Sequence, residues 1–362
     1  MKFLALVFGF IFLQQIALGE PRCAGGGEGG GVPFGLIPKN IAEQPNWIKT
    51  KSMVQGFLFW ETTNRVLYHD GMSWVRAHDL ANGLEYGVSE LGIIPPFSPV
   101  KDPDNRYFST VNFSSLFDSK NHTFIKMPMN VPQQELFWHE GVLYTQALGE
   151  TAPGSMTGSI HAYKAKSKKV TTCFYNLNGE KLSFANNNEY PYAYGFTQKE
   201  LPDGTFDITT YKVDVRKELF GSGCSIEIVQ KYKDPFPGRV SKMHRYNKID
   251  GNIFELEHKT KNLLWDKGVD ECIFYDLGRI RYSVLNGDSP SVATWDQEDG
   301  LGLIYPRLKK RTQIEGFGHM GLSASDIAIT KNGDRLYFAQ RPEENEEKLK
   351  LLYRVDLNGV KE

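Results

Sequence analysis

The chain has 362 residues, with 42 Lys or Arg against 43 Asp or Glu and a formal net charge of −1. That balance argues against a nucleic-acid-binding protein, because neutralising several phosphates requires a clear cationic surplus. Apolar residues make up 40% of the chain and aromatic residues 13%, which is too rich in large side chains for a disordered protein. Aromatic residues favour strands, and the 35 Gly and 18 Pro supply turns, so the composition favours an all-β fold.

The N-terminus has the layout of a secretory signal peptide. A short basic start, Met1-Lys2, precedes an apolar run from Phe3 to Leu13, and Ala17-Leu18-Gly19 offers small residues for cleavage before Glu20. The apolar run is shorter than the ~20 residues of a transmembrane helix, and no later run approaches that length. We therefore expect residues 1–19 to be a signal peptide and the protein to be secreted, extracellular and without a membrane span. The alternative is a buried strand or an N-terminal anchor.

Residues 20–39 are predicted to be a Gly-rich tail, because Ala24 to Gly31 reads AGGGEGGG. Such a segment cannot bury enough surface to offset its own chain entropy.

Four cysteines follow the signal peptide. They are Cys23, Cys173, Cys224 and Cys272. None of them forms a C-x-x-C pair, and export favours two disulfides, whose pairing has three possibilities. Asn112 and Asn121 each begin a glycosylation sequon, which the secretory route would allow to be used if the residue is exposed.

From residue 40 onward the sequence repeats a unit of strand, turn and strand. The three clearest copies are 57–68 (FLFWETTNRVLY), 135–144 (ELFWHEGVLY) and 327–337 (IAITKNGDRLY). In the last copy Asn332-Gly333 is a hairpin signal. Each copy leads into further strand-like segments, at 73–78, 158–163 and 351–356. Four strands every ~40–50 residues are typical of propeller blades.

Less regular hairpins lie between these copies. Asp203-Gly204 separates strand-like residues 192–196 from 206–213, and Asp250-Gly251 separates 244–249 from 252–257. The last three cysteines are spaced by 51 and 48 residues, close to one repeat each, which is consistent with related places on successive blades. We therefore predict a single β-propeller over residues 40–362, with six four-stranded blades favoured over seven. The alternative is a β-sandwich or two smaller β domains.

The units Gly56–Tyr68 and Ser325–Tyr337, and the segment Leu352–Gly359, resemble blades of the six-bladed propellers related to gluconolactonase and SMP-30. The secreted yellow and major royal jelly proteins are similar in size, signal peptide and late blades. The resemblance covers about a third of the chain and rests on blade pattern, which many propellers share, so it supports the fold more than the function.

The lactonase-type resemblance implies a divalent metal in the central channel. Its expected ligands are a Glu before the first inner strand and Asn and Asp residues in later blades. In this chain Gly56 stands at the Glu position with Gln55 beside it, and Ser325 stands at an Asn position with Asp326 adjacent. Because Ca²⁺ requires several oxygen ligands with net negative charge, these departures weaken the expected site for Ca²⁺ or another divalent metal.

Catalytic motifs are scarce. His139-Glu140-Gly141 begins like a zincin motif, but no second His follows at the required helical spacing. For each histidine, a satisfied or solvated side chain is the simpler interpretation. His319 is of most interest, because its Gly-rich loop directly precedes Ser325-Asp326 and could reach the channel mouth.

The candidate site residues are the polar ones that interrupt the blade pattern. Asn187 belongs to the cluster Asn186-Asn187-Asn188-Glu189, whose amides could orient a ligand or cap a turn. Arg239 and His244 could supply positive charge. The predicted ligand-binding residues are Gln55, Asn187, Arg239, His244, His319 and Asp326, and Asp326 is also the predicted metal ligand. By contrast, Trp60, Tyr68, Trp138, Tyr144 and Tyr337 recur at matching blade positions and are expected to pack between blades.

Three functions of different classes remain open. The favoured one is a monomeric secreted propeller that binds a small organic ligand, aromatic compounds included, in or at its channel. The second is a channel-sited enzyme, either a metal-assisted lactone or ester hydrolase or an oxidoreductase acting on an aromatic small molecule. The third is an extracellular protein-interaction module that uses a blade face.

Overall fold

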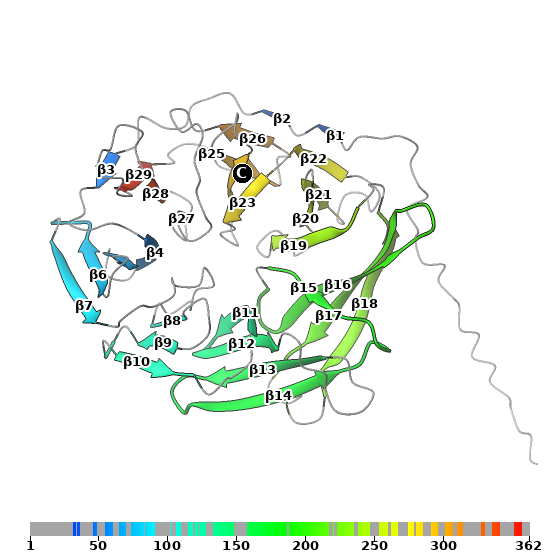
Figure 1. Cartoon of the computed structure of the whole chain (residues 1–362), viewed down its shortest axis with the longest axis horizontal. Helices are drawn as coiled ribbons and strands as arrows, with labels where there is room; N and C mark the ends of the chain where they lie inside the picture. Colours follow the sequence, from blue (N-terminus) through cyan, green and yellow to red (C-terminus); the bar gives the residue numbers. More distant parts are fainter. Residues whose placement is uncertain are drawn as a thin grey trace, which may run out of the picture.

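The computed structural model of the chain shows an all-β protein whose strands form a ring of sheets (Figure 1). It describes residues 32–33, 35–36, 46–48, 55–60, 65–69, 74–82, 84–90, 102, 106–109, 115–118, 120–121, 123–127, 133–147, 158–186, 188–216, 220, 223–234, 238–246, 253–259, 262–266, 274–278, 280–284, 291–295, 301–306, 310–313, 327–329, 335–340 and 351–356. Within these residues the 29 strands form seven sheets.

Each sheet is a blade, and the blades follow one another in chain order. Blade 1 holds β4 (Gln55–Trp60), β5 (Arg65–His69), β6 (Trp74–Asp79) and β7 (Glu85–Glu90), and blade 2 holds β8 (Tyr107–Ser109), β9 (Ser115–Asp118) and β10 (Thr123–Lys126). Blade 3 holds β11 (Gln133–His139), β12 (Val142–Ala147), β13 (Gly158–Lys164) and β14 (Lys169–Tyr175), and blade 4 holds β15 (Ser183–Phe184), β16 (Tyr192–Glu200), β17 (Phe206–Asp214) and β18 (Ser225–Lys233). Blade 5 begins with β19 (Val240–Tyr246), β20 (Ile253–His258), β21 (Asn262–Asp266) and β22 (Phe274–Gly278), and blade 6 begins with β23 (Ile280–Val284), β24 (Ser291–Trp295), β25 (Leu301–Tyr305) and β26 (Lys310–Gln313). Blade 7 begins with β27 (Ile327–Ile329), β28 (Arg335–Gln340) and β29 (Leu351–Asp356).

The hairpins expected from the repeated units form as predicted. The three copies become β4–β5, β11–β12 and β27–β28, each an antiparallel pair. The first strand of each blade lies nearest the middle of the ring and the last lies at its rim (Figure 1). The prediction of an all-β propeller is therefore confirmed.

The number of blades differs from the expected six. The described residues form seven sheets, and the sequence repeat misses blade 2, whose three described strands are only three or four residues long. The expected number came from dividing the chain length by a period of ~40–50 residues, which allows six or seven blades, so the period alone could not decide between them.

The N-terminal segment completes the rims of three blades. β3 (Asn46–Ile48) pairs antiparallel with β29 and becomes the fourth strand of blade 7, so that the ring is closed by strands from distant parts of the chain. β1 (Val32–Pro33) and β2 (Gly35–Leu36) pair in parallel with β22 and β26, the outer strands of blades 5 and 6. Part of the segment predicted to be a tail thus forms strands at the rim, and a domain boundary at residue 39/40 stays a prediction.

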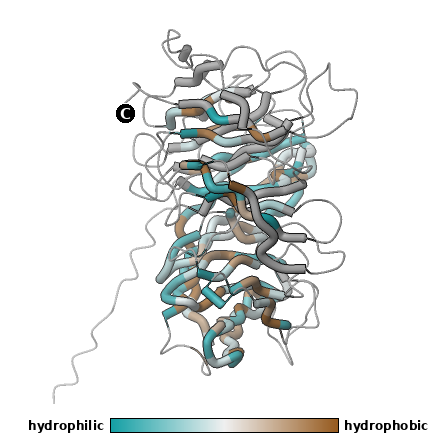
Figure 2. The backbone as a smooth tube through the Cα atoms, turned by 90° about the vertical axis from the view of Figure 1, so that its left-hand side faces the viewer, coloured by the Kyte–Doolittle hydropathy of each residue, from teal (hydrophilic) through white to brown (hydrophobic). Residues whose placement is uncertain are grey.

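The core is divided among the interfaces between neighbouring blades. One cluster packs Phe196 and Ile208 of blade 4 against Met243, Leu256 and Trp265 of blade 5. Similar clusters join blade 3 to blade 4 and blade 2 to blade 3. Seen edge-on, hydrophobic residues are spread through the layers of strands (Figure 2). Trp138 and Tyr144 belong to these clusters, as expected, and Tyr68 and Tyr337 are buried as well.

Candidate functional site

Only part of the predicted site falls on described residues. Asn187, His319 and Asp326 lie outside the described residues, as do Cys23, Cys272 and Asn112. Gln55 begins β4 and pairs in register with His69. This pairing describes the backbone of Gln55 and not its side chain. The predicted metal ligand and half of the predicted ligand contacts therefore stay predictions, while Arg239 and His244 can be placed.

Arg239 and His244 lie at opposite ends of the innermost strand of blade 5. Arg239 is exposed just before β19, whereas His244 is buried near its far end. Five residues of extended strand span roughly 17 Å. The two cationic candidates therefore do not belong to one small-molecule site, and the ligand-binding role of each stays a prediction.

A short connection, residues 185–191 between β15 and β16, lies beside this end of β19. The backbone N–H of Asn186 donates to the Met243 carbonyl at 2.8 Å, and the Arg245 N–H donates to the Asn186 carbonyl at 3.1 Å. The Asn186 side chain completes the bridge with its Nδ2 atom 3.1 Å from His244 Nδ1. The connection thus joins blade 4 to the inner strand of blade 5.

His244 also faces a carboxylate. Its Nε2 atom lies 3.8 Å from Glu257 Oε2 on β20, and Lys242 Nζ lies 3.8 Å from the same oxygen. Ser241 Oγ donates to Glu257 Oε1 at 3.0 Å. Burial alone would raise the pKa of Glu257, but the His244 ring, Lys242 and Ser241 together outweigh burial and lower that pKa below its usual range.

The other end of the same connection reaches blade 3. The Tyr190 ring stacks on the His139 ring, with 3.8 Å between centroids and planes 1° apart. Tyr144 lies beside this stack, at 6.1 Å from Tyr190, and Phe220 meets Tyr144 edge-on at 6.0 Å. Burial first, and then the neighbouring Tyr190 and Glu140, raise the pKa of Tyr144 to about 12, so Tyr144 stays neutral and serves as an aromatic wall.

Arg245 adds a cation to this region. Its guanidinium lies over the Tyr194 ring at 4.0 Å from the centroid, in cation–π geometry. Burial lowers the pKa of Arg245, while Tyr194 and Glu189 act in the opposite direction. A guanidinium remains charged at any physiological pH. Arg245 follows His244 on an extended strand, so the two side chains point to opposite faces of β19. We refer to His139, Asn186, Tyr190 and His244 as the inner-edge cluster.

Asn188, in contrast, has a structural role. Its Nδ2 atom donates to the carbonyls of Ala185 and Tyr194, and its Oδ1 atom accepts from the Tyr194 N–H at 2.7 Å. The polar run at 186–189 therefore divides, with Asn188 capping the turn and Asn186 reaching His244. The turn-capping alternative is thereby confirmed for Asn188, while the ligand-orienting role stays a prediction.

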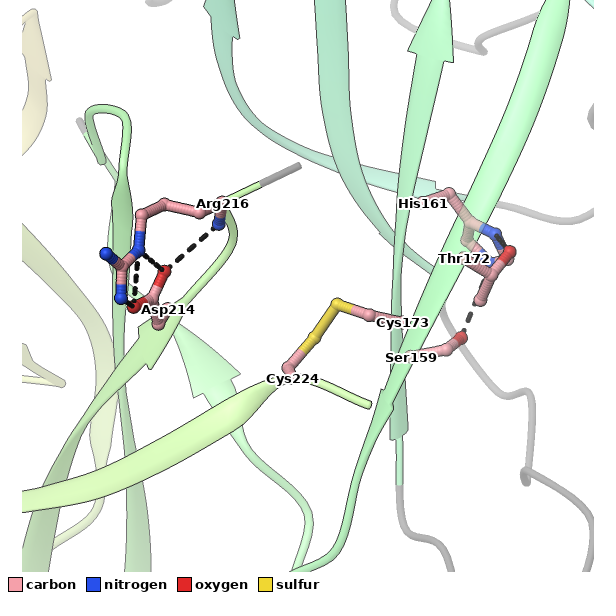
Figure 3. Close-up of a disulfide and its surroundings, with 7 residues drawn as sticks. All are labelled: Ser159, His161, Thr172, Cys173, Asp214, Arg216 and Cys224. Carbon is pink, nitrogen blue, oxygen red and sulfur yellow. Dashed lines mark hydrogen bonds and ion pairs between the residues drawn. A yellow bond between two sulfur atoms is a disulfide. The ribbon is translucent and has the colours of Figure 1, made fainter. Parts of the chain in front are cut away.

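His161 and Cys173 lie on β13 and β14 of blade 3, and Cys224 lies next to Cys173 from the start of β18 in blade 4 (Figure 3). The His161 ring is satisfied by hydroxyls, with Nδ1 2.9 Å from Thr172 Oγ1 and Nε2 3.3 Å from Ser159 Oγ. Cys173 on β14 is bonded to Cys224, which precedes β18. One predicted disulfide is thereby paired, and it links the outer strands of successive blades, as the repeat spacing indicated. Asn121 is exposed in the turn after β9.

Sequence reasoning missed much of the inner-edge cluster. His139 was considered only as part of a zincin motif, and Tyr190 and the neighbouring Arg245 were not singled out. The only sequence signal for these two residues was their position, because Tyr190 directly follows the polar run 186–189 and Arg245 directly follows His244. Among the described residues no group of three His, Cys, Asp or Glu side chains lies at metal-binding distance. The described residues also contain no helix long and apolar enough to cross a bilayer.

No family model matches the chain, and no curated protein sequence matches it. Solved structures do resemble it in fold. An oligogalacturonate lyase in complex with manganese is 11% identical with a TM-score of 0.53, covering 91% of this chain and 98% of that chain. The RRP9 WD40 repeats are 9% identical with a TM-score of 0.50, covering 87% and 97%. Raptor from Chaetomium thermophilum is 12% identical with a TM-score of 0.53, covering 86% of this chain and 29% of that one.

These similarities define the class of protein as a β-propeller. At such low identity they show the fold alone and carry no information on activity. They do not single out the SMP-30/gluconolactonase or royal jelly families that the blade pattern resembles.

Proposed function

We propose that this protein is an exported β-propeller that binds a small organic ligand at the inner edges of blades 3 to 5. The observation that carries the proposal is the connection at residues 185–191. Its Tyr190 ring lies flat against His139 of blade 3, and its Asn186 amide bonds His244 of blade 5. One short segment thereby presents an aromatic face and hydrogen-bonding groups beside the innermost strands.

The residue types of the inner-edge cluster suit a small organic molecule. Ligand sites combine aromatic or apolar walls with a few polar groups that fix orientation. Here the wall is supplied by Tyr190 with Tyr144 behind it, and the polar groups by Asn186 and His244. The His139 side chain is 37% exposed, so solvent and solutes reach the stack.

Export is supported by the N-terminal sequence and by the disulfide. Residues 1–19 are the proposed signal peptide, and the Cys173–Cys224 bond belongs to an oxidising compartment. We propose an extracellular location, with Asn112 and Asn121 as glycosylation sites.

A channel-sited enzyme is the second candidate. It is favoured by the pairing of the His244 imidazole with the Glu257 carboxylate, a combination that moves protons in many active sites. Turnover of a bound compound would favour this reading over simple binding.

The proposal is tested by native mass spectrometry of protein from its source, followed by thermal shift with the compound released. Tyr190→Ala is expected to weaken binding about tenfold or more, because it removes the aromatic ring on which the ligand would stack. Tyr192→Ala is the matched control, since the Tyr192 ring lies beside Lys212 and outside the cluster. The proposal fails if no compound accompanies the protein and no small aromatic molecule stabilises it.

A further inference from the structure

Very short strand pairs place the N-terminal segment on the rim of the propeller. β1 and β2 lie outside β22 and β26, the last strands of blades 5 and 6 (Figure 1). Each pair has only two residues in register, and Pro33 of β1 has no N–H to donate. Ordering each residue costs conformational entropy, and parallel pairing is slightly less stable per residue than antiparallel pairing. Pairs this short are weak anchors for the segment.

The two cysteines that remain after the pairing of Cys173 with Cys224 stand close in sequence to one of these pairs. They are Cys23 and Cys272, and both lie outside the described residues. Cys23 is nine positions before Val32, and Cys272 is three positions before Tyr275, the register partner of Val32. Because β1 and β22 run parallel, both cysteines precede the pair at the same end.

The covalent chain limits the separation of these two cysteines. Neighbouring strands lie about 4.8 Å apart and three residues span at most about 10 Å, so Cys272 is within about 15 Å of Val32. A Gly-rich chain of nine residues has a root-mean-square end-to-end distance of about 15–18 Å, and residues 24–31 read AGGGEGGG. Cys23 can therefore reach Cys272 without disturbing the β1–β22 pair.

We propose that Cys23 and Cys272 form a disulfide that straps the N-terminal segment to blade 5. Of the three pairings that the sequence leaves open, this is the one compatible with the bond between Cys173 and Cys224. A cysteine left unpaired in an oxidising compartment would be a reactive thiol. The strap is independent of the proposed ligand site and shares only the secretory route with the proposed function.

The bond forms by exchange with an oxidising disulfide, such as that of a disulfide oxidoreductase in the secretory compartment. One cysteine thiolate attacks this disulfide and forms a mixed disulfide, and the second thiolate then displaces the oxidant. The two cysteines together lose two electrons and two protons, and the oxidant takes up both as it leaves as a dithiol.

The strap would fix the end of the segment that β3 does not hold. β3 pairs with β29 in blade 7, and the disulfide would tie the other end to blade 5. β1 and β2 lie between these two attachments in the sequence. Anchoring at both ends reduces the entropy that each short pair has to overcome, which explains how two-residue strands are retained on the rim.

The test is a peptide map of the full-length protein secreted by its source, alkylated and digested with trypsin without reduction. Cleavage after Lys and Arg places Cys23 in peptide 23–39 and Cys272 in peptide 268–279. The two peptides are expected as one cross-linked species that separates on reduction. This measurement on the wild type requires no variant to fold.

Peptides 170–181 and 218–231, which Cys173 and Cys224 join, are the internal control. Recovery of this control together with an alkylated Cys23, or with Cys23 linked to anything other than peptide 268–279, overturns the strap and leaves export standing. A second copy of the chain counts among those other partners. Absence of both cross-links contradicts the strap and the proposed secretory route together.

Two variants measure what the bond does for the segment. Cys23→Ser and Cys272→Ser are each expected to speed amide hydrogen exchange about tenfold or more in β1, β2 and β22. The double variant should show the same increase as either single one, because both remove one bond. Exchange in β14 should stay unchanged, since its own disulfide is intact. Unchanged exchange at the rim of blade 5 would overturn the anchoring role.

Discussion

The Cys173–Cys224 disulfide is expected to provide a large share of the stability of the seam between blades 3 and 4. The bond joins residues 51 positions apart, and the loop-closure model converts a loop of this length into about 4 kcal/mol of stabilisation. The native state also benefits, because the Cys224 N–H donates to the Phe174 carbonyl at 2.8 Å and Phe220 packs against Tyr144. Opening the bond should therefore loosen this segment as well as enlarge the unfolded ensemble.

The assay compares urea unfolding of the wild type and of a Cys173→Ala, Cys224→Ala variant, each with and without reductant, by the fluorescence of the six tryptophans. The loss of unfolding free energy that reductant causes in the variant measures the contribution of the other cysteines. Subtracting it from the loss that reductant causes in the wild type gives the contribution of the Cys173–Cys224 bond. A loss of about 2–4 kcal/mol is expected. Hydrogen exchange should increase first in β14 and in the start of β18. A loss below about 1 kcal/mol, or equal exchange in all blades, would refute the reasoning.

Three further substitutions test the packing and the electrostatics. Thr210 is fully buried and its hydroxyl has no hydrogen-bond partner in the described part of the chain, so Thr210→Val should stabilise the protein by about 1 kcal/mol in urea unfolding, and destabilisation would contradict this. Gly158→Ala should destabilise by about 1–3 kcal/mol, because the added Cβ would overlap the buried Tyr175 ring; a neutral effect would show that the ring can move. The lowered pKa of Glu257 stabilises the fold above pH ~4.5 and is lost as the pH falls through the folded pKa. The unfolding midpoint of Glu257→Gln should therefore fall less than that of the wild type between pH 6 and 3, and parallel profiles would count against the ion pair.

The blade-forming hairpins could be predicted from the sequence because each is formed by residues close together in the chain. The strands at 327–329 and 335–340 pair antiparallel, and the sequence between them contains Asn332-Gly333, a dipeptide that favours a hairpin turn. The expected pair of strands around Asp203-Gly204 likewise forms β16 and β17 in continuous register. In each case the residues that decide the structure lie within about 20 positions of one another.

The candidate site was harder to predict from the sequence because its residues come from three blades. His139 and Tyr190 are 51 positions apart and meet only because blades 3 and 4 pack together. Asn186 and His244 are separated by 58 positions and meet for the same reason at the next interface. No local pattern encodes such a meeting, so the sequence could name His244 but not its partners.

By itself the sequence determined an all-β chain of hairpins and favoured a propeller over a β-sandwich, since alternating aromatic strands and turn residues define hairpins over short distances. Only the tertiary structure decided that the described sheets number seven, that Cys173 pairs with Cys224, and that β3 closes the ring by pairing with β29. These features depend on contacts between segments far apart in the chain. Their formation is governed by how whole blades bury their faces against one another, and that packing has no signature in any single stretch of residues.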